Sequence, residues 1–314
     1  MPNIGGIIAV SYVESQFEFN LISPSVLDYS VIDGTEPAES MLTVNEYIAE
    51  DYWSAVNGSS LPENLQGVRS RADEISEKYG VRILLSSQCL PACTFAEYPT
   101  TTTDQMDLAD EAASINAALD SLEEALSLYP AGFFPQFRSE FGDGGIRIML
   151  VGGFESNFNM IGYSVQNSLW HNIYVDIFSE GLVGTYCHEI WHATEDHITS
   201  INYGEFDVVQ WAELNPDGFQ YIFDPAESIL NEGDYTYFGS TKPKDCYFID
   251  GYAKTNERED RARIMEYAMT GFFGSELSEY PHLYAKLRYM SDKIRRYFDT
   301  TGWGVTRWES ALGE

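Results

Sequence analysis

The sequence predicts an α+β fold, in which a small mixed sheet is followed by a mostly helical C-terminal half. Short apolar runs of strand length occur at residues 81–85 and 146–151, and a run at 171–178 alternates apolar and polar residues. Longer stretches with an apolar residue at every third or fourth position lie between and after these runs, as in amphipathic helices. Apolar residues make up 44% of the 314 residues and aromatic residues 14%, which indicates a globular chain rather than a disordered one.

The chain is expected to have two parts, which differ in how clearly their sequence patterns indicate helices and strands. Residues 1–60 are irregular apart from one strand expected at residues 10–21, and residues 33–37 have the composition of a turn or linker. We therefore predict an appended N-terminal segment, or part of a neighbouring domain, at 1–60 and the main domain at 61–314.

The first regular elements of the main domain are two helices and two strands. Residues 68–79 fit a helix with Gly80 as its C-cap, and residues 81–85 follow as a strand. A stronger helix, with Thr103 or Asp104 as N-cap, should end at Tyr129 before a proline. Its apolar stripe comprises Leu108, Ala112, Ile115, Leu119, Leu122 and Leu126. The next strand is expected at residues 146–151.

The alternating run at residues 171–178 is predicted to be the edge strand of the sheet. Ile173, Val175 and Ile177 would share one face, and the polar residues between them the other. A free edge can pair with an extended peptide by β-addition, although an ordinary sheet edge would show the same pattern. Near the end of the chain, the helix with Leu283, Leu287, Met290, Ile294 and Tyr297 serves core packing.

The charge balance narrows the classes of partner. Forty-nine acidic and eighteen basic residues give a formal net charge of −31. Such a field repels nucleic acid and anionic membrane surfaces, so we expect neither as a partner. No run reaches the 18 apolar residues that a membrane span requires, so no span is expected.

The compartment follows less directly from the sequence. Residues 4–10 are apolar but too short for a signal peptide, so an extracellular or cell-surface location would require a leader that this chain lacks. We expect that location, with the cytoplasm as the alternative. Cys89, Cys93, Cys187 and Cys246 allow two disulfides or four free thiols. The sequence gives no oligomeric state.

A short motif for metal binding lies in the middle of the chain, at Cys187-His188-Glu189-Ile190-Trp191-His192. Four helical residues turn the chain by about 400°, so His188 and His192 would lie one turn apart on the same face. Two imidazoles in this arrangement can share one zinc ion, and Glu189 would then act as general base toward a water. Ser179 is the expected N-cap of this helix. The alternative is a chance match between two unrelated histidines.

A third protein ligand is needed for a catalytic zinc ion. His197 lies nine residues after His188, about 900° around the helix, and so would point to the opposite side. We expect it to be a surface or packing histidine. Glu259 is the better candidate, because it lies near the start of a second predicted helix from Asn256. On that helix Glu259, Arg263 and Glu266 share a face, and the small Ala262 allows another helix to come close. The alternative for Glu259 is a capping box with Asn256.

These residues resemble a known family. An H-E-x-x-H motif followed by a glutamate ligand on a second helix resembles the gluzincin metallopeptidases. Tyr252, seven residues before Glu259, is similar to the tyrosine at that place in anthrax lethal factor and the secreted Pro-Pro endopeptidases. The resemblance covers roughly residues 62–300 as an order of elements. It implies a zincin-like catalytic domain that binds one catalytic Zn²⁺ through His188, His192 and Glu259.

The same resemblance assigns roles in catalysis. It implies that Glu189 is the base and that the Tyr252 hydroxyl stabilises the oxyanion of the tetrahedral intermediate. A core tyrosine is the alternative for Tyr252. The family often has an acidic residue four positions after the ligand glutamate, where this chain has Arg263. Support for the ligands must then come from another residue, for which we consider Asp260.

The expected function is that of a zinc-dependent peptidase, in particular an endopeptidase, acting on a peptide or protein substrate. The alternative is a non-enzymatic, acidic cell-surface binding protein that uses a peptidase fold as a scaffold. The presence of Glu189 argues against the alternative, because a binding protein has no need of a base beside a metal. An occluded metal site would favour the binding protein, and an open groove along residues 171–178 the peptidase.

Overall fold

The computed structural model describes most of the main domain and two short N-terminal strands. The described residues are 9–13, 16–20, 61–94, 98–139, 142, 144–155, 160–167, 169–202, 206, 208–223, 238 and 244–314. They form a mixture of helices with a small mixed sheet, and after Asp176 the regular elements among them are all helical, which confirms the predicted α+β class. The boundary between 1–60 and 61–314 stays a prediction, and the proposed linker at 33–37 lies outside the described residues.

The central sheet has four strands in the order β3-β5-β8-β7. The strands are β3 (Arg82–Leu85), β5 (Gly145–Val151), β7 (Gly162–Asn167) and β8 (Trp170–Asp176). β3, β5 and β8 run parallel to one another, and β7 pairs antiparallel with β8. The mixed sheet therefore ends in one antiparallel strand.

The prediction that residues 171–178 form the sheet edge is wrong. β8 lies between β5 and β7, and the edge strand is β7. The polar alternation in β8 has a different cause, because a second layer covers that face. Tyr174 stacks on Tyr163 with ring centroids 4.5 Å apart and donates to the Ala92 carbonyl oxygen at 3.2 Å. Its polar atom is thus satisfied inside the protein rather than by solvent.

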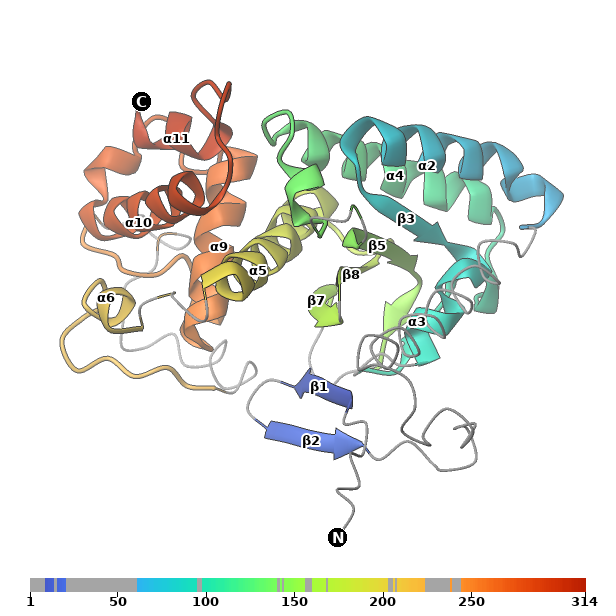
Figure 1. The fold of residues 1–314 in the computed structure, drawn as a ribbon, viewed down its shortest axis with the longest axis horizontal. Helices are drawn as coiled ribbons and strands as arrows, with labels where there is room; N and C mark the ends of the chain where they lie inside the picture. The colour runs from blue at the N-terminus through green and yellow to red at the C-terminus, as the bar shows by residue number, and fades with distance from the viewer. Residues whose placement is uncertain are drawn as a thin grey trace, which may run out of the picture.

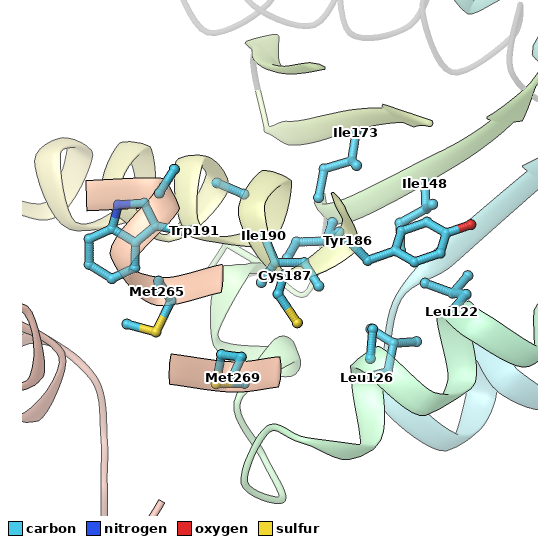
Figure 2. Close-up of a cluster of buried hydrophobic side chains, with 14 of the residues drawn as sticks. Leu122, Leu126, Ile148, Ile173, Tyr186, Cys187, Ile190, Trp191, Met265 and Met269 are labelled. Carbon is cyan, nitrogen blue, oxygen red and sulfur yellow. The ribbon is translucent and has the colours of Figure 1, made fainter. Parts of the chain in front are cut away.

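Helices on one face of the sheet build the main core (Figure 1). They are α2 (Gln66–Tyr79), α4 (Glu111–Ser127) and α5 (Leu182–Asn202). Figure 2 shows Leu122 and Leu126 of α4 directed toward Ile148, Ile173 and Tyr186. Burial of such apolar side chains provides most of the free energy that fixes α5 on the sheet.

Two predicted helix starts are wrong. Thr102 and Gln105 form a capping box on the separate turn η5 (Thr103–Gln105), and α4 begins only after Asp110, whose side chain accepts from Ala113 N at 2.9 Å. Ser179 does not cap α5, because its hydroxyl donates to Asp176 at 3.2 Å and the helix begins after Gly181. The C-cap of α2 at Gly80, with φ of 78°, is confirmed.

The C-terminal helices pack against α5. Its helices are α6 (Val208–Ala212), η8 (Tyr252–Lys254), α9 (Glu257–Thr270), η9 (Leu277–Glu279), α10 (Pro281–Tyr297) and α11 (Arg307–Leu312). α9 lies alongside α5 (Figure 1), and Ala262 of α9 is fully buried. In Figure 2, Met265 and Met269 of α9 lie near Trp191 and Cys187 of α5.

The remaining elements are short. They are β1 (Ala9–Val13), β2 (Gln16–Asn20), η3 (Glu63–Leu65), η4 (Ser86–Cys89), α3 (Leu90–Thr94), β4 (Thr100–Thr101), η6 (Phe134–Phe137) and β6 (Gly153–Phe154). β1 and β2 pair with each other as antiparallel strands, where one strand had been expected. All four cysteines are free thiols. In the part of the chain that is described, no helix has the length and apolar character to cross a membrane.

Candidate metal centre

Three side chains from two helices converge on one point. His188 and His192 come from α5, and Glu259 comes from the first turn of α9. His188 Nε2 lies 2.9 Å from Glu259 Oε2 and 3.2 Å from His192 Nε2, and His192 Nε2 lies 3.5 Å from Glu259 Oε2. Among the described residues, this is the one group of three His, Cys, Asp or Glu side chains that could hold a metal ion together.

The spacing of these atoms fits a zinc ion. Zinc bonds of about 2.0–2.1 Å in a tetrahedral site place the ligand atoms about 3.3 Å from one another. The three observed separations lie on both sides of that value. Two imidazoles and one carboxylate are also a donor set that catalytic zinc sites use. The residues that the sequence predicted as ligands therefore fit the ion.

The approach of α9 to α5 is fixed by its N-cap and by two ion pairs. The Asn256 side chain accepts from Arg258 N at 2.9 Å and from Glu259 N at 3.0 Å, which starts the helix just before the ligand. Arg258 then pairs with Asp196 of α5 at 2.6 Å. Arg261 pairs with Glu195, where both side chains are nearly inaccessible. The Asn256 cap is confirmed, while the Glu259 carboxylate faces the histidines.

Strong electrostatic coupling holds the cluster together. Burial alone would lower the pKa of His188, but its hydrogen bonds to Glu259 and Glu266 outweigh burial and raise the pKa to about 10. Burial would raise the pKa of Glu259, yet the charges of His192 and His188 hold it well below its usual range. The carboxylates thus favour positive charge at this point, which a divalent cation supplies.

Glu189 lies beside the cluster and beneath the edge strand. A Cβ atom on Gly162 of β7 would lie only 3.0 Å from Glu189 Oε1, so glycine leaves room for the carboxylate. Glu189 Oε2 is buried and has no hydrogen-bond partner among the described residues. Burial raises the pKa of Glu189 to about 7, although the two histidines oppose this. A carboxylate with these properties can accept and return a proton near neutral pH.

Tyr252 lies near His188. Its ring centroid is 6.2 Å from that of His188, and the two planes are inclined by 35°. Tyr252 begins the turn η8 and is half-buried. The turn is stabilised by Asp250, whose Oδ1 accepts from Ala253 N at 3.0 Å. The structure thus brings Tyr252 near the candidate ligand His188, and its role stays a prediction.

His197 lies away from the cluster, in an aromatic environment. Its ring centroid is 4.8 Å from that of Phe137 and 5.3 Å from that of Phe298. Burial lowers the pKa of His197 to about 4, so it is a neutral packing residue. This placement agrees with the prediction from helix geometry.

The prediction that Asp260 supports the ligands is wrong. Asp260 is fully buried on a different side of α9, where its Oδ2 binds Lys286 Nζ at 2.6 Å and accepts from the Tyr221 hydroxyl at 2.9 Å. Glu266 takes the expected place instead, with its Oε2 3.3 Å from His188 Nδ1. The sequence held the signal, since Glu266 lies seven residues after Glu259 and so two helical turns along the same face.

Comparisons with profiles of known protein families, with curated protein sequences and with solved structures found no significant match to this chain.

Proposed function

We propose that this protein is a zinc-dependent endopeptidase of the gluzincin type with a zincin-like catalytic domain. The observation that carries the proposal is the convergence of the His188, His192 and Glu259 ligand atoms within 4.8 Å of one another. Glu189 follows His188 directly in the chain, so the same helix supplies two ligands and a base. Support for the fold comes from the antiparallel edge strand β7 beside α5.

Each residue has a distinct part in the proposed reaction. His188, His192 and Glu259 would hold the ion, which supplies Lewis acidity toward a peptide carbonyl and toward an attacking water. Glu189 takes a proton from that water and returns it to the leaving amine. The Tyr252 hydroxyl donates to the oxyanion that forms as the carbonyl is attacked.

The substrate would bind as an extended peptide. Among the described strands, β7 has a partner on one side only, so the backbone groups of its other side can pair with such a chain, and its described side chains are half-buried. This edge replaces the interior strand β8 as the expected site of β-addition. Gly162 lies on the edge next to Glu189, which would place the scissile bond near the base.

Metal analysis combined with peptide hydrolysis tests the proposal. We expect about one zinc ion per chain, loss of hydrolysis of a broad peptide library after chelation, and recovery after zinc is restored. A protein that binds no zinc and has unchanged thermal stability with and without the ion would overturn the metal centre. A fully zinc-bound protein that cleaves no member of the library would favour the binding-protein alternative.

The Tyr252→Phe substitution tests the oxyanion role. Removing one oxyanion donor typically lowers kcat on the order of 100-fold, and KM should change little because the contact forms in the transition state. Phenylalanine keeps the ring beside His188, so zinc content and stability should be preserved. A kcat within about threefold of the wild type would remove Tyr252 from the mechanism.

A further inference from the structure

His188 is held at both ring nitrogens by carboxylates of α9. Its Nε2 faces the ligand Glu259 at 2.9 Å, and its Nδ1 faces Glu266 at 3.3 Å. A metal-binding histidine commonly donates its other N–H to a carboxylate, which fixes the tautomer and the orientation of the ring. Glu266 lies where it can accept this hydrogen bond from His188 Nδ1.

Glu266 is itself held by an arginine that reaches a further carboxylate. Arg263 Nη1 donates to Glu266 Oε2, and Arg263 Nε donates to Asp250 Oδ2 at 2.9 Å. The guanidinium side chain is only 19% exposed and the Glu266 side chain 14%, so solvent weakens these charged contacts little. Arg263 therefore bridges two acidic side chains that have different neighbours.

Asp250 continues this connection toward Tyr252. Its Oδ2 accepts from Arg263, while its Oδ1 accepts from Ala253 N, the residue after Tyr252 in the turn η8. One arginine is thus connected through Glu266 to the ligand His188, and through Asp250 to the turn that carries Tyr252.

We propose that Arg263 is a positioning residue that sets His188 and Tyr252 relative to each other through Glu266 and Asp250. The inference rests on the proposed function, since it assigns how that site is assembled. It also explains how arginine can stand where the resembling family often has an acidic residue. The carboxylate is supplied one turn later on α9, and the arginine connects it to the turn η8.

The shape of the site favours arginine and glutamate at these positions. A guanidinium has five donors in a rigid planar fork and can bind two carboxylates at once, whereas a lysine ammonium lacks this fixed geometry. Gly184 of α5 leaves room for Glu266, because a Cβ atom there would lie 3.0 Å from Glu266 Oε1. Glu266 can therefore reach His188 across a close contact between α5 and α9.

The test compares Arg263→Met with a control, Arg295→Met. Arg295 of α10 is another partly buried arginine that pairs with a carboxylate, in this case Glu309 of α11 at 2.6 Å. Zinc affinity is measured by competition with a chelator, and kcat and KM with a cleaved peptide. Arg263→Met should bind zinc about 10-fold more weakly, within the range for loss of a residue that supports a ligand, and should also have a lower kcat. Arg295→Met should keep its zinc affinity within about threefold, because its ion pair joins α10 to α11.

Two further variants separate the two connections of Arg263. Glu266→Gln should weaken zinc binding by about 10-fold or more, because His188 loses its charged partner. Asp250→Asn should leave zinc affinity within about threefold and lower kcat by about 10-fold, because the change affects mainly the turn of Tyr252. In a Tyr252→Phe background, Asp250→Asn should lower kcat little further, because both substitutions remove the contribution of the Tyr252 hydroxyl. Arg263→Lys should restore only part of the zinc affinity.

The outcomes distinguish this inference from the proposed function. A wild-type protein without zinc binding would refute the proposed function before any variant is compared. With a zinc-binding and active wild type, equal zinc affinity and kcat in Arg263→Met and Arg295→Met would refute the positioning role. Equal losses of kcat from Asp250→Asn in the wild-type and Tyr252→Phe backgrounds would refute it as well. If Arg263→Met does not fold, Glu266→Gln and Asp250→Asn decide the question with the same readouts.

Discussion

The His188→Ala variant is expected to lose both zinc binding and peptide hydrolysis. His188 Nε2 is the ligand atom closest to the other two, at 2.9 Å from Glu259 and 3.2 Å from His192. Without it, only His192 and Glu259 remain, and two protein ligands are fewer than catalytic zinc sites use. The measurements are zinc content after dialysis and initial rates of hydrolysis with excess substrate.

A matched substitution on the same helix provides the control. His197→Ala also removes a histidine from α5, but one that packs against Phe137 and Phe298. We expect this variant to lose stability while retaining about one zinc per chain and its activity. Thermal unfolding of both variants identifies any loss of zinc that results only from unfolding. A folded His188→Ala protein that still carries one tightly bound zinc ion would show that the metal centre lies elsewhere.

The parts of the fold that were predicted correctly depend on local sequence. The stripe of α2 and its C-cap at Gly80 depend on neighbouring residues, and so does the Asn256 cap of α9. The position of β8 in the sheet does not depend on local sequence. Whether a strand is interior or at the edge is decided by the pairing with β7, and its polar residues were misleading because a second layer satisfies them. Alternation is evidence of two different faces but does not show that one of them is exposed.

The predictions of helix starts were wrong where a second capping residue lay close to the first. Thr102 and Gln105 make a complete capping box, yet the backbone becomes extended at Met106. The long helix α4 begins only after its N-cap, Asp110. Ser179 similarly has the right residue type, but its hydroxyl is used by Asp176 in the turn before α5. Residue type alone cannot distinguish a short turn from the first turn of a long helix.

The candidate site was more predictable than its surroundings. Helix periodicity placed His188 and His192 together and excluded His197, because four and nine residues correspond to opposite faces. For the contacts behind the ligands, periodicity shows only that Glu266 shares a helix face with Glu259. The packing of α9 against α5 and α10 decides that Asp260 contacts Lys286 and that Glu266 contacts His188.

The Glu189→Gln variant should retain zinc but lose hydrolysis. Glutamine keeps the size of the side chain and cannot act as a base, so kcat should fall about 10²- to 10⁴-fold, the range for loss of general acid–base catalysis. Zinc content should be unchanged, because Glu189 is not one of the three converging ligands. Glu189 is buried, and its Oε2 lacks a hydrogen-bond partner in the described structure, so removing the charge should not reduce stability.

Glu195→Gln provides a contrast six residues further along α5. Glu195 and Glu189 are each only 4% exposed, but Glu195 pairs with Arg261. Removing one partner of a buried ion pair leaves a buried charge and commonly costs about 3–5 kcal/mol. We therefore expect Glu195→Gln to lower the free energy of unfolding, measured by urea denaturation, with a much smaller effect on kcat than Glu189→Gln. Equal losses of kcat in the two folded variants would mean that Glu189 acts only through the structure of α5. A loss of kcat confined to Glu189→Gln, at full zinc occupancy, is the result that the proposed mechanism requires.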